Sequence, residues 1–183
     1  MIVFLLGALL AARRRGCALR PLLRAAPLWP LFAVELVHMG FVLAAFCGDY
    51  RFVPYGAALQ TAFLLALLPP VLVYRLYRPA LLGAGLCLAG TVLNRLVMAA
   101  NGGRMPVLPT LSRLTGYYRE GLLEQGLDSV HIAMGPAVRL GFLGDWIDLG
   151  FVILSPGDVL IHLFVSIILY ASAQALTKRE KKG

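Results

Sequence analysis

Several side chains that can carry charge fall inside apolar stretches of this sequence. They are Glu35, His38, Arg95, Asp158 and His162, with Asn94 next to Arg95. A charged group inside hydrocarbon is unfavourable unless it is paired or hydrated, so each of these residues is a candidate functional residue. At a helical rise of about 1.5 Å per residue, all of them fall within one band about 10 Å deep. The sequence therefore predicts one polar cluster shared by three helices.

The spacing within this set suggests two pairs. Glu35 and His38 are three residues apart, and Asp158 and His162 are four apart, so each pair shares one face of a helix. Carboxylates and imidazoles together can bind a transition metal. The other apolar stretches add no further carboxylate, so a hydrogen-bonded cluster without a metal is the favoured interpretation. Neither a metal nor any other cofactor is expected.

Asp158 has a second interpretation, as part of a helix start. In the sequence Ser-Pro-Gly-Asp, Ser155 suits the N-cap, Pro156 the first helical position and Asp158 the third, where a carboxylate is favoured by capping geometry and by the helix dipole. A buried ion pair between Arg95 and Asp158 is an alternative that serves folding alone. The capping role is compatible with ligand binding, because a helix N-terminus attracts anions.

The hexapeptide that begins at Asn101 also allows two interpretations. Asn101 ends an apolar run one heptad after Asn94, and Gly102 and Gly103 permit the positive φ angles of a helix-ending turn. Arg104 then falls at the level of lipid headgroups. The segment is either a helix C-cap with an interfacial arginine, or an anion site in which a backbone nest and a guanidinium hold a phosphate or carboxylate headgroup.

The composition excludes an ordinary soluble protein. Of 183 residues, 60% are apolar and 14% are charged, whereas soluble chains average about 45–50% and about 25%. The net charge of +8 comes from basic residues at the ends of apolar runs, and no basic cluster is interleaved with aromatic residues as in nucleic-acid interfaces. The expected partner is membrane lipid and not nucleic acid, and other membrane proteins remain open as partners.

The apolar runs predict an all-α, polytopic membrane bundle of about five transmembrane helices in one domain, residues 1–183. The predicted spans are about residues 1–15, 28–47, 57–74, 79–100 and 154–176. The first apolar run is short, so a segment lying at the membrane surface is an alternative for it. With the C-terminus inside, eleven Lys and Arg residues are cytoplasmic and five are outside, which predicts an outside N-terminus and a cytoplasmic C-terminus.

This orientation places residues 101–150 on the extracytoplasmic side as one long loop. Apolar side chains recur there at helical spacing after a possible start at Thr110. They are Leu111, Leu114, Tyr118 and Leu122. The pattern predicts an amphipathic helix on the outer leaflet. Residues 138–146 have the composition of an interfacial or re-entrant segment.

Three motifs and a loop histidine carry a family resemblance. The motifs are N-G-G-R-M-P-V (residues 101–107), R-L-x-F-L-G-D (139–145) and S-x-G-D-V-L (155–160), with His131 between the first two. In this order they resemble a family of small bacterial membrane proteins known only as a domain of unknown function, number five-three-one-seven. The resemblance implies a multi-pass protein of the bacterial cell membrane and implies no activity.

Three functions follow as hypotheses. The first is a binding or accessory role, in which a polar cluster near the outer face holds a lipid headgroup or small anion. The candidate binding residues are Asn94, Arg95, Asn101, Arg104 and Asp158, with Asp145 nearby. The second is an intramembrane hydrolase or transferase in which Asp145 or Asp148 works with Asp158 as an acid/base pair, assisted by His131. The third is a small transporter, ranked last because the five spans contain no repeat.

Overall fold

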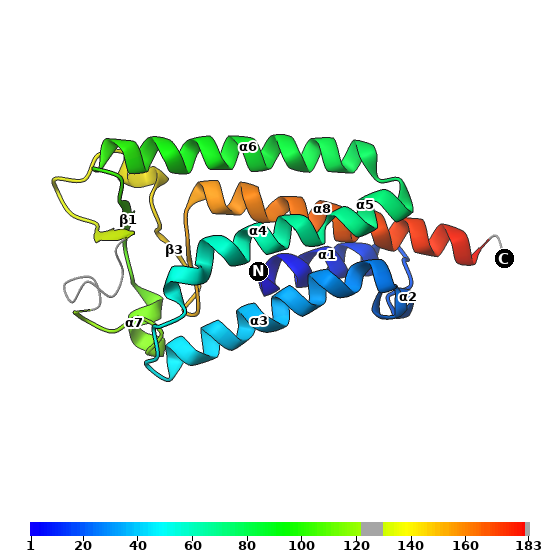
Figure 1. The fold of residues 1–183 in the computed structure, drawn as a ribbon, viewed down its shortest axis with the longest axis horizontal. Helices are drawn as coiled ribbons and strands as arrows, with labels where there is room; N and C mark the ends of the chain where they lie inside the picture. Colours follow the sequence, from blue (N-terminus) through cyan, green and yellow to red (C-terminus); the bar gives the residue numbers. More distant parts are fainter. Residues whose placement is uncertain (122–129, 182–183) are drawn as a thin grey trace. The chain divides into compact units, whose positions relative to one another are not determined.

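The computed structural model describes residues 1–121 and 130–181 and is mostly helical (Figure 1). The helices are α1 (Ile2–Arg14), α2 (Arg20–Arg24), η1 (Ala26–Leu28), α3 (Trp29–Phe46), η2 (Val53–Tyr55), α4 (Gly56–Ala66), α5 (Leu68–Tyr74), α6 (Tyr77–Ala100), α7 (Leu111–Thr115), η3 (Gly141–Leu143) and α8 (Pro156–Glu180). Four short strands are β1 (Met105–Val107), β2 (His131–Ala133), β3 (Ile147–Asp148) and β4 (Ile153–Leu154).

Three helical stretches of the described chain are long and apolar enough to cross a membrane. They are Ala26–Phe46, Tyr77–Ala100 and Pro156–Glu180, which at 1.5 Å per residue measure about 31 to 38 Å. The apolar stretch Ala58–Tyr74 is shorter and is divided between α4 and α5, where Pro69 and Pro70 lack the N–H groups that a continuous helix needs. Helix α1 has 13 residues, so a count of five spans stays a prediction.

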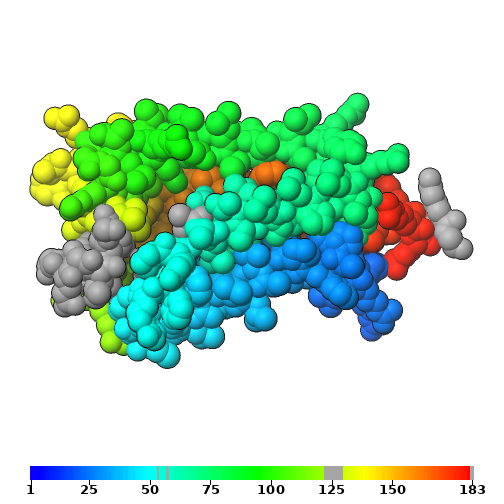
Figure 2. Space-filling view, viewed as in Figure 1, coloured from blue at the N-terminus to red at the C-terminus, as the bar shows by residue number. Residues whose placement is uncertain are grey.

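Large apolar side chains remain exposed along these helices. Leu36 and Leu43 on α3 and Leu81 and Leu88 on α6 are all exposed, and Figure 2 shows the side chains of α6 and α4 at the surface. Extended apolar surface of this kind is unusual on a soluble monomer. The exposed faces are compatible with a protein that lies in lipid.

One compact unit consists of Met1–His38, Ala57–Cys87 and the chain from Ile161 to residue 181. Its core includes Leu5, Leu28, Leu67 and Ile168, which come from α1, η1, the α4–α5 junction and α8. Two polar contacts connect its helices: the Ser166 hydroxyl donates to the Phe4 carbonyl (2.9 Å), and Arg179 donates to the Val73 carbonyl (3.2 Å). Apolar burial and these side-chain contacts to backbone carbonyls hold the unit together.

The second unit consists of Met39–Gly56 and the described part of Leu88–Leu160. Strands β1 and β3 lie beside the C-terminal part of α6 (Figure 1). Strand β1 pairs in parallel with β2, Met105 opposite His131, and Val107 forms a further parallel bridge with Asp145. Strands β3 and β4 form an antiparallel pair, with Ile147 opposite Leu154. These strands cannot be predicted from the sequence, because runs of two or three residues are too short to show an alternating pattern.

The predicted amphipathic helix is shorter than expected. Helix α7 has five residues, so the prediction that it continues through Tyr118 is wrong. Gly116 adopts a left-handed conformation (φ 80°) after the helix, and the Tyr118 N–H returns to the Ser112 carbonyl (3.0 Å). A glycine C-cap therefore prevails over the apolar periodicity. Leu122 lies outside the described residues, and residues 138–146 hold only the short η3 helix as regular helix.

Gly157 marks the closest approach of α8 to α6 within the second unit. A Cβ atom at this position would lie 2.0 Å from Asn94 Oδ1 and 2.6 Å from the Gly90 carbonyl oxygen. A backbone oxygen cannot move aside as a flexible side chain can. The sequence motif S-x-G-D therefore contains glycine for a packing reason.

We predict that Gly157→Ala lowers the free energy of unfolding by about 1–3 kcal/mol, because the added methyl group overpacks this contact. Thermal unfolding of the purified protein in detergent measures the change. Gly85→Ala on α6 is the matched control, since its Cβ would meet nothing within 4 Å. Equal unfolding temperatures for Gly157→Ala and the unchanged protein would contradict the predicted overpacking.

Candidate functional site

Asp158 and Ser155 form a reciprocal cap at the start of α8. The Asp158 N–H donates to Ser155 Oγ (2.9 Å), and the Ser155 N–H donates to Asp158 Oδ2 (3.1 Å). Pro156 is the first helical residue. The predicted helix start is confirmed, because the two side chains satisfy N–H groups that have no partner within the helix.

Asn94 of α6 completes this cap. Its Nδ2 donates to Asp158 Oδ1 (2.9 Å), and its Oδ1 accepts from Ser155 Oγ (2.9 Å). Asn94 thus joins both capping side chains, and the ring of hydrogen bonds closes through the backbone N–H groups of Ser155 and Asp158. Arg95 is exposed and makes no ion pair with Asp158 in the described structure, so the predicted Arg95–Asp158 ion pair is wrong. Each oxygen of the Asp158 carboxylate already accepts one hydrogen bond, from Asn94 Nδ2 and from the Ser155 N–H, so it is satisfied without a cation.

Asn101 holds the long loop against the end of α6. Its Nδ2 donates to the Val97 and Arg139 carbonyls (both 2.7 Å), and its Oδ1 accepts from the Arg139 N–H (2.9 Å). The helix ends in a turn at Gly102 and Gly103, both with positive φ (66° and 83°), as the sequence predicts. Asn101 therefore fixes the backbone of a residue that lies 38 positions further along the chain.

Asp148 caps α7. Its Oδ2 accepts from the Thr110 N–H (2.7 Å), the Ser112 N–H (2.9 Å) and the Ser112 hydroxyl (2.7 Å), and its Oδ1 accepts from the Gly150 N–H (2.8 Å). Partial burial alone would raise the pKa of Asp148. The hydrogen bonds from Ser112, Gly150 and Thr110 outweigh burial, so the pKa lies below its ordinary value.

The small sheet brings His131 and Asp145 together. His131 Nε2 lies 3.2 Å from Asp145 Oδ2, and the Asp145 side chain is buried. Asp145 exchanges backbone hydrogen bonds with Pro106 and Leu108 (both 2.8 Å), and a Cβ at Gly144 would lie 2.6 Å from the Pro106 carbonyl oxygen. Glycine thus permits the close approach that sets Asp145 opposite His131. A carboxylate in this position orients the imidazole ring, as in acid–base pairs, and also joins β2 to the Asp145 segment.

The predicted aspartate pair has no supporting contact. In residues 1–121 and 130–181, no hydrogen bond joins Asp158 to Asp145 or Asp148. Asp148 and Asp158 instead each cap a helix, and Asp145 contacts His131. A two-carboxylate mechanism requires two acids close enough to share a proton. The acid/base role of these aspartates therefore stays a prediction.

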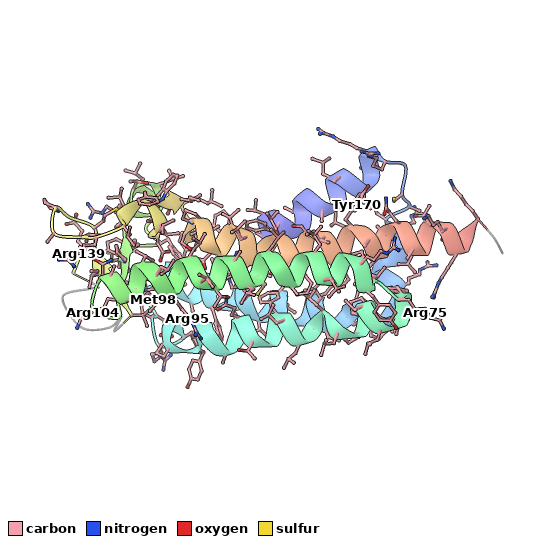
Figure 3. All side chains as sticks on the ribbon, turned by 90° about the horizontal axis from the view of Figure 1, so that it is seen from above. Arg75, Arg95, Met98, Arg104, Arg139 and Tyr170 are labelled. Atoms are coloured by element: carbon pink, nitrogen blue, oxygen red, sulfur yellow. The ribbon has the colours of Figure 1, made fainter. Side chains whose placement is uncertain are left out.

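Arg104 and Arg139 are the two motif cations whose side chains have no structural contact in the described part of the chain. Both are exposed, and Figure 3 shows both at the end of α6. The Arg104 N–H donates to the Asn101 carbonyl (3.3 Å), while the Asn101 side chain binds both peptide groups of Arg139. Two arginines 35 positions apart in the sequence thus flank one asparagine. The sequence alone did not single out Arg139 as a candidate, although its motif R-L-x-F-L-G-D contains it.

The other ionisable residues of the apolar stretches lie in the first unit. Glu35 and His38 are on α3, with His38 Nδ1 3.6 Å from Glu35 Oε1, and the His162 ring packs against Phe4 (centroids 5.1 Å apart). Asn94 and Asp158 belong to the second unit, so the single predicted cluster is divided between two units. No group of three or more His, Cys, Asp and Glu residues in the described chain is arranged to hold a metal ion.

These features define a helical protein with three candidate membrane spans and a polar end that bears the sequence motifs. The chain belongs to a family of unknown function, DUF5317, whose model matches residues 25–170. This confirms the family resemblance, and all three motifs lie within the matched range. No curated protein and no solved structure matches the chain.

We predict that the cap formed by Asp148 weakens in acid. The pKa of Asp148 is lower in the folded protein, so its stabilising contribution is present above the ordinary aspartate pKa of about 3.9 and is lost as the pH falls through the lower folded value. Hydrogen–deuterium exchange at the Thr110 and Ser112 amides, corrected for intrinsic rates, should accelerate over this range.

Two variants test this assignment. Asp148→Ala should destabilise α7 by about 0.5–2 kcal/mol at neutral pH, as loss of a cap does. Asp148→Asn keeps one acceptor oxygen and should remove the acid-dependent increase in exchange. If exchange still accelerates in acid in Asp148→Asn, a group other than Asp148 causes the pH dependence.

Proposed function

We propose that this chain is an integral membrane protein whose motif-bearing end binds a phosphate-type anion, through Arg104 and Arg139. One observation carries the proposal: Asn101 holds the backbones of both arginines, while both guanidinium groups make no contact within the described chain. By contrast, the motif side chains Asn101, Asp145, Ser155 and Asp158 each make a hydrogen bond or ion pair with another part of the second unit.

The chemistry of the pair suits phosphate. Each guanidinium presents a planar fork of N–H donors that can bind two phosphate oxygens, and two neighbouring forks match the charge of a phosphorylated group. The predicted backbone nest receives less support, because the Gly103 and Arg104 N–H groups already donate to the Met98 and Asn101 carbonyls. We therefore assign the anion to the two side chains.

The position of the arginines favours a lipid headgroup as the source of this phosphate. Both lie beyond the C-terminal end of α6, a candidate span of 24 residues, and the end of such a helix falls at the level of headgroups. Arg95 is also exposed on α6 and lies between one and two helical turns before Asn101. It adds a third positive charge near the C-terminal end of this helix. Asn94 and Asp158 support the site by fixing α6 to α8 and need not touch the ligand.

A second candidate is an acid–base role for His131, oriented by Asp145 at 3.2 Å. This arrangement replaces the aspartate pair as the basis for a hydrolase or transferase. The anion-binding role is preferred because it explains two exposed arginines at a helix end, whereas the His131–Asp145 contact also serves to hold the strands. No contact in the described residues favours a transporter.

We predict that Arg104→Ala and Arg139→Ala each reduce retention of phosphatidylglycerol about tenfold or more. Loss of one charged hydrogen-bonding partner costs about 1.5–3 kcal/mol, and about 1.4 kcal/mol corresponds to a factor of ten in affinity. Native mass spectrometry of protein released from mixed phosphatidylglycerol and phosphatidylcholine nanodiscs measures the retained lipid. A parallel sample in phosphatidylcholine with added inorganic phosphate tests whether a free anion binds instead.

Arg51→Ala is the control for this experiment. Arg51 is an equally cationic side chain of the same unit, 83% exposed, and is already paired with Asp49 (2.7 Å). Its removal changes net charge by the same amount and should leave lipid retention unaltered. Equal retention by the Arg104→Ala/Arg139→Ala double variant and by Arg51→Ala would reject the proposed site.

The proposed orientation places this end of the protein outside the cell, in a bacterial cell membrane, with the C-terminus cytoplasmic. Its support is the excess of Lys and Arg at the opposite ends of the helices. We predict that a fluorescent reporter fused after Lys182, which lies outside the described residues, is active in the cytoplasm and that alkaline phosphatase at the same place is inactive. Active alkaline phosphatase there would reverse the orientation.

A further inference from the structure

A carboxylate and an imidazole lie near the middle of a candidate membrane span. Glu35 lies nine residues after Ala26 and eleven before Phe46, the ends of this span, which is about 14 Å from one end and about 16 Å from the other. His38 follows one helical turn later on the same face. Neither residue belongs to the unit that carries Arg104 and Arg139.

The polar atoms of this pair are buried without hydrogen-bond partners. Glu35 is 5% exposed, and within residues 1–121 and 130–181 neither of its carboxylate oxygens nor His38 Nδ1 has a hydrogen-bond partner. The shortest contact between the two side chains is 3.6 Å, from His38 Nδ1 to Glu35 Oε1. Buried polar atoms in proteins are nearly always hydrogen-bonded, so a carboxylate oxygen that faces a ring nitrogen calls for a shared proton between them.

Apart from the Met1 amino group, the described surroundings of the pair are mostly apolar. Leu31, one turn before Glu35, is fully buried, and the edge of the Phe63 ring of α4 faces the His38 ring (centroids 6.1 Å apart). Helix α4 contains no Asp, Glu, Lys, Arg or His. From α1, the Met1 amino group acts on Glu35 electrostatically but forms no hydrogen bond with it. On α8, His162 packs against Phe4 of α1.

We propose that Glu35 and His38 hold one exchangeable proton between them and form a protonation site inside the membrane. With this proton on Glu35, the carboxyl group donates to His38 Nδ1. With it on His38, the imidazolium donates to the Glu35 carboxylate. Either arrangement satisfies two atoms that otherwise lack partners, and it requires only that the 3.6 Å contact shorten to about 3 Å by side-chain rotation.

The proton balance explains why this arrangement suits an apolar span. Uptake of one proton from water converts the ionised carboxylate and the neutral imidazole, with a net charge of −1, into a pair with no net charge. Release returns the proton to water and leaves a negative charge among apolar side chains, which hydrocarbon disfavours. Protonation of this pair is therefore linked to the packing of α3 against α1 and α4.

Isotope-edited infrared spectroscopy of the full chain in phosphatidylcholine nanodiscs tests the site. With ¹³C-labelled glutamate, a protonated carboxyl C=O band should be present at neutral pH and should disappear in alkali. Glu35→Gln should abolish the band, and His38→Gln should shift it because its hydrogen-bond partner is gone. Glu120→Gln is the matched control, since the Glu120 side chain is 87% exposed and should leave the band unchanged.

A second measurement does not depend on the carboxyl band. In ¹⁵N-histidine NMR of the same samples, assigned with His38→Gln, the ring-nitrogen chemical shifts of His38 at neutral pH should change in Glu35→Gln, because the carboxyl partner is lost. Unchanged His38 chemical shifts in Glu35→Gln, or the absence of both a protonated glutamate band and a His38 imidazolium signal at neutral pH in the unchanged protein, would overturn the proposal. The carboxyl band and the imidazolium signal are measured on the unchanged protein, so the test remains valid even if Glu35→Gln does not fold. Neither readout involves Arg104 or Arg139, so its outcome is separate from that of the lipid experiment.

Discussion

The amide side chain of Asn101 is the constraint on which the motif-bearing end depends. A helix end leaves carbonyl groups without partners, and a long loop with little regular structure leaves both carbonyl and N–H groups unsatisfied. Asn101 meets both needs at once, since it binds the Val97 carbonyl of its own helix and both peptide groups of Arg139. The Asn101 contacts hold the loop segment at Arg139 against the end of α6. Strands of only two or three residues benefit from such contacts, because their own few hydrogen bonds do little to hold the loop.

Glycine has a specific role in each of the three motifs. Gly102 and Gly103 provide the positive φ angles that end α6. Gly144 and Gly157 lie where a Cβ atom would collide with a backbone oxygen, of Pro106 and Gly90 respectively. The motif glycines thus lie at turns and at close backbone approaches. The polar residues beside them form hydrogen bonds with the backbone groups that these turns leave without partners. Against this background, Arg104 and Arg139, whose side chains make no structural contact in the described chain, differ from the other motif residues and are the proposed binding groups.

The two compact units treat polar atoms differently. In the second unit, Asn94, Ser155 and Asp158 satisfy one another, and Asp148 receives four short hydrogen bonds. In the first unit, the facing polar atoms of Glu35 and His38 have no hydrogen-bond partner among the described residues. A closed ring of hydrogen bonds gives rigidity, whereas the proposed Glu35–His38 pair has room for a shared proton. The ring around Asp158 and the cap at Asp148 thus stabilise the fold, whereas Glu35 and His38 are the residues that we propose exchange a proton with the solvent.

The sequence by itself determined the features that depend on neighbours within a few residues. These are the apolar helices, the Ser155 cap with Asp158 at the third position, and the helix-ending turn at Gly102. Only the tertiary structure decided that Asp158 meets Asn94 and not Arg95, that α7 ends at Gly116, and that Arg139 comes to the end of α6. The physical reason is distance along the chain: the contacts of Asn94 with Asp158 and of Asn101 with Arg139 join residues 64 and 38 positions apart. Helical periodicity and capping rules act over one or two turns, so they predict which groups need partners but not which distant groups become those partners.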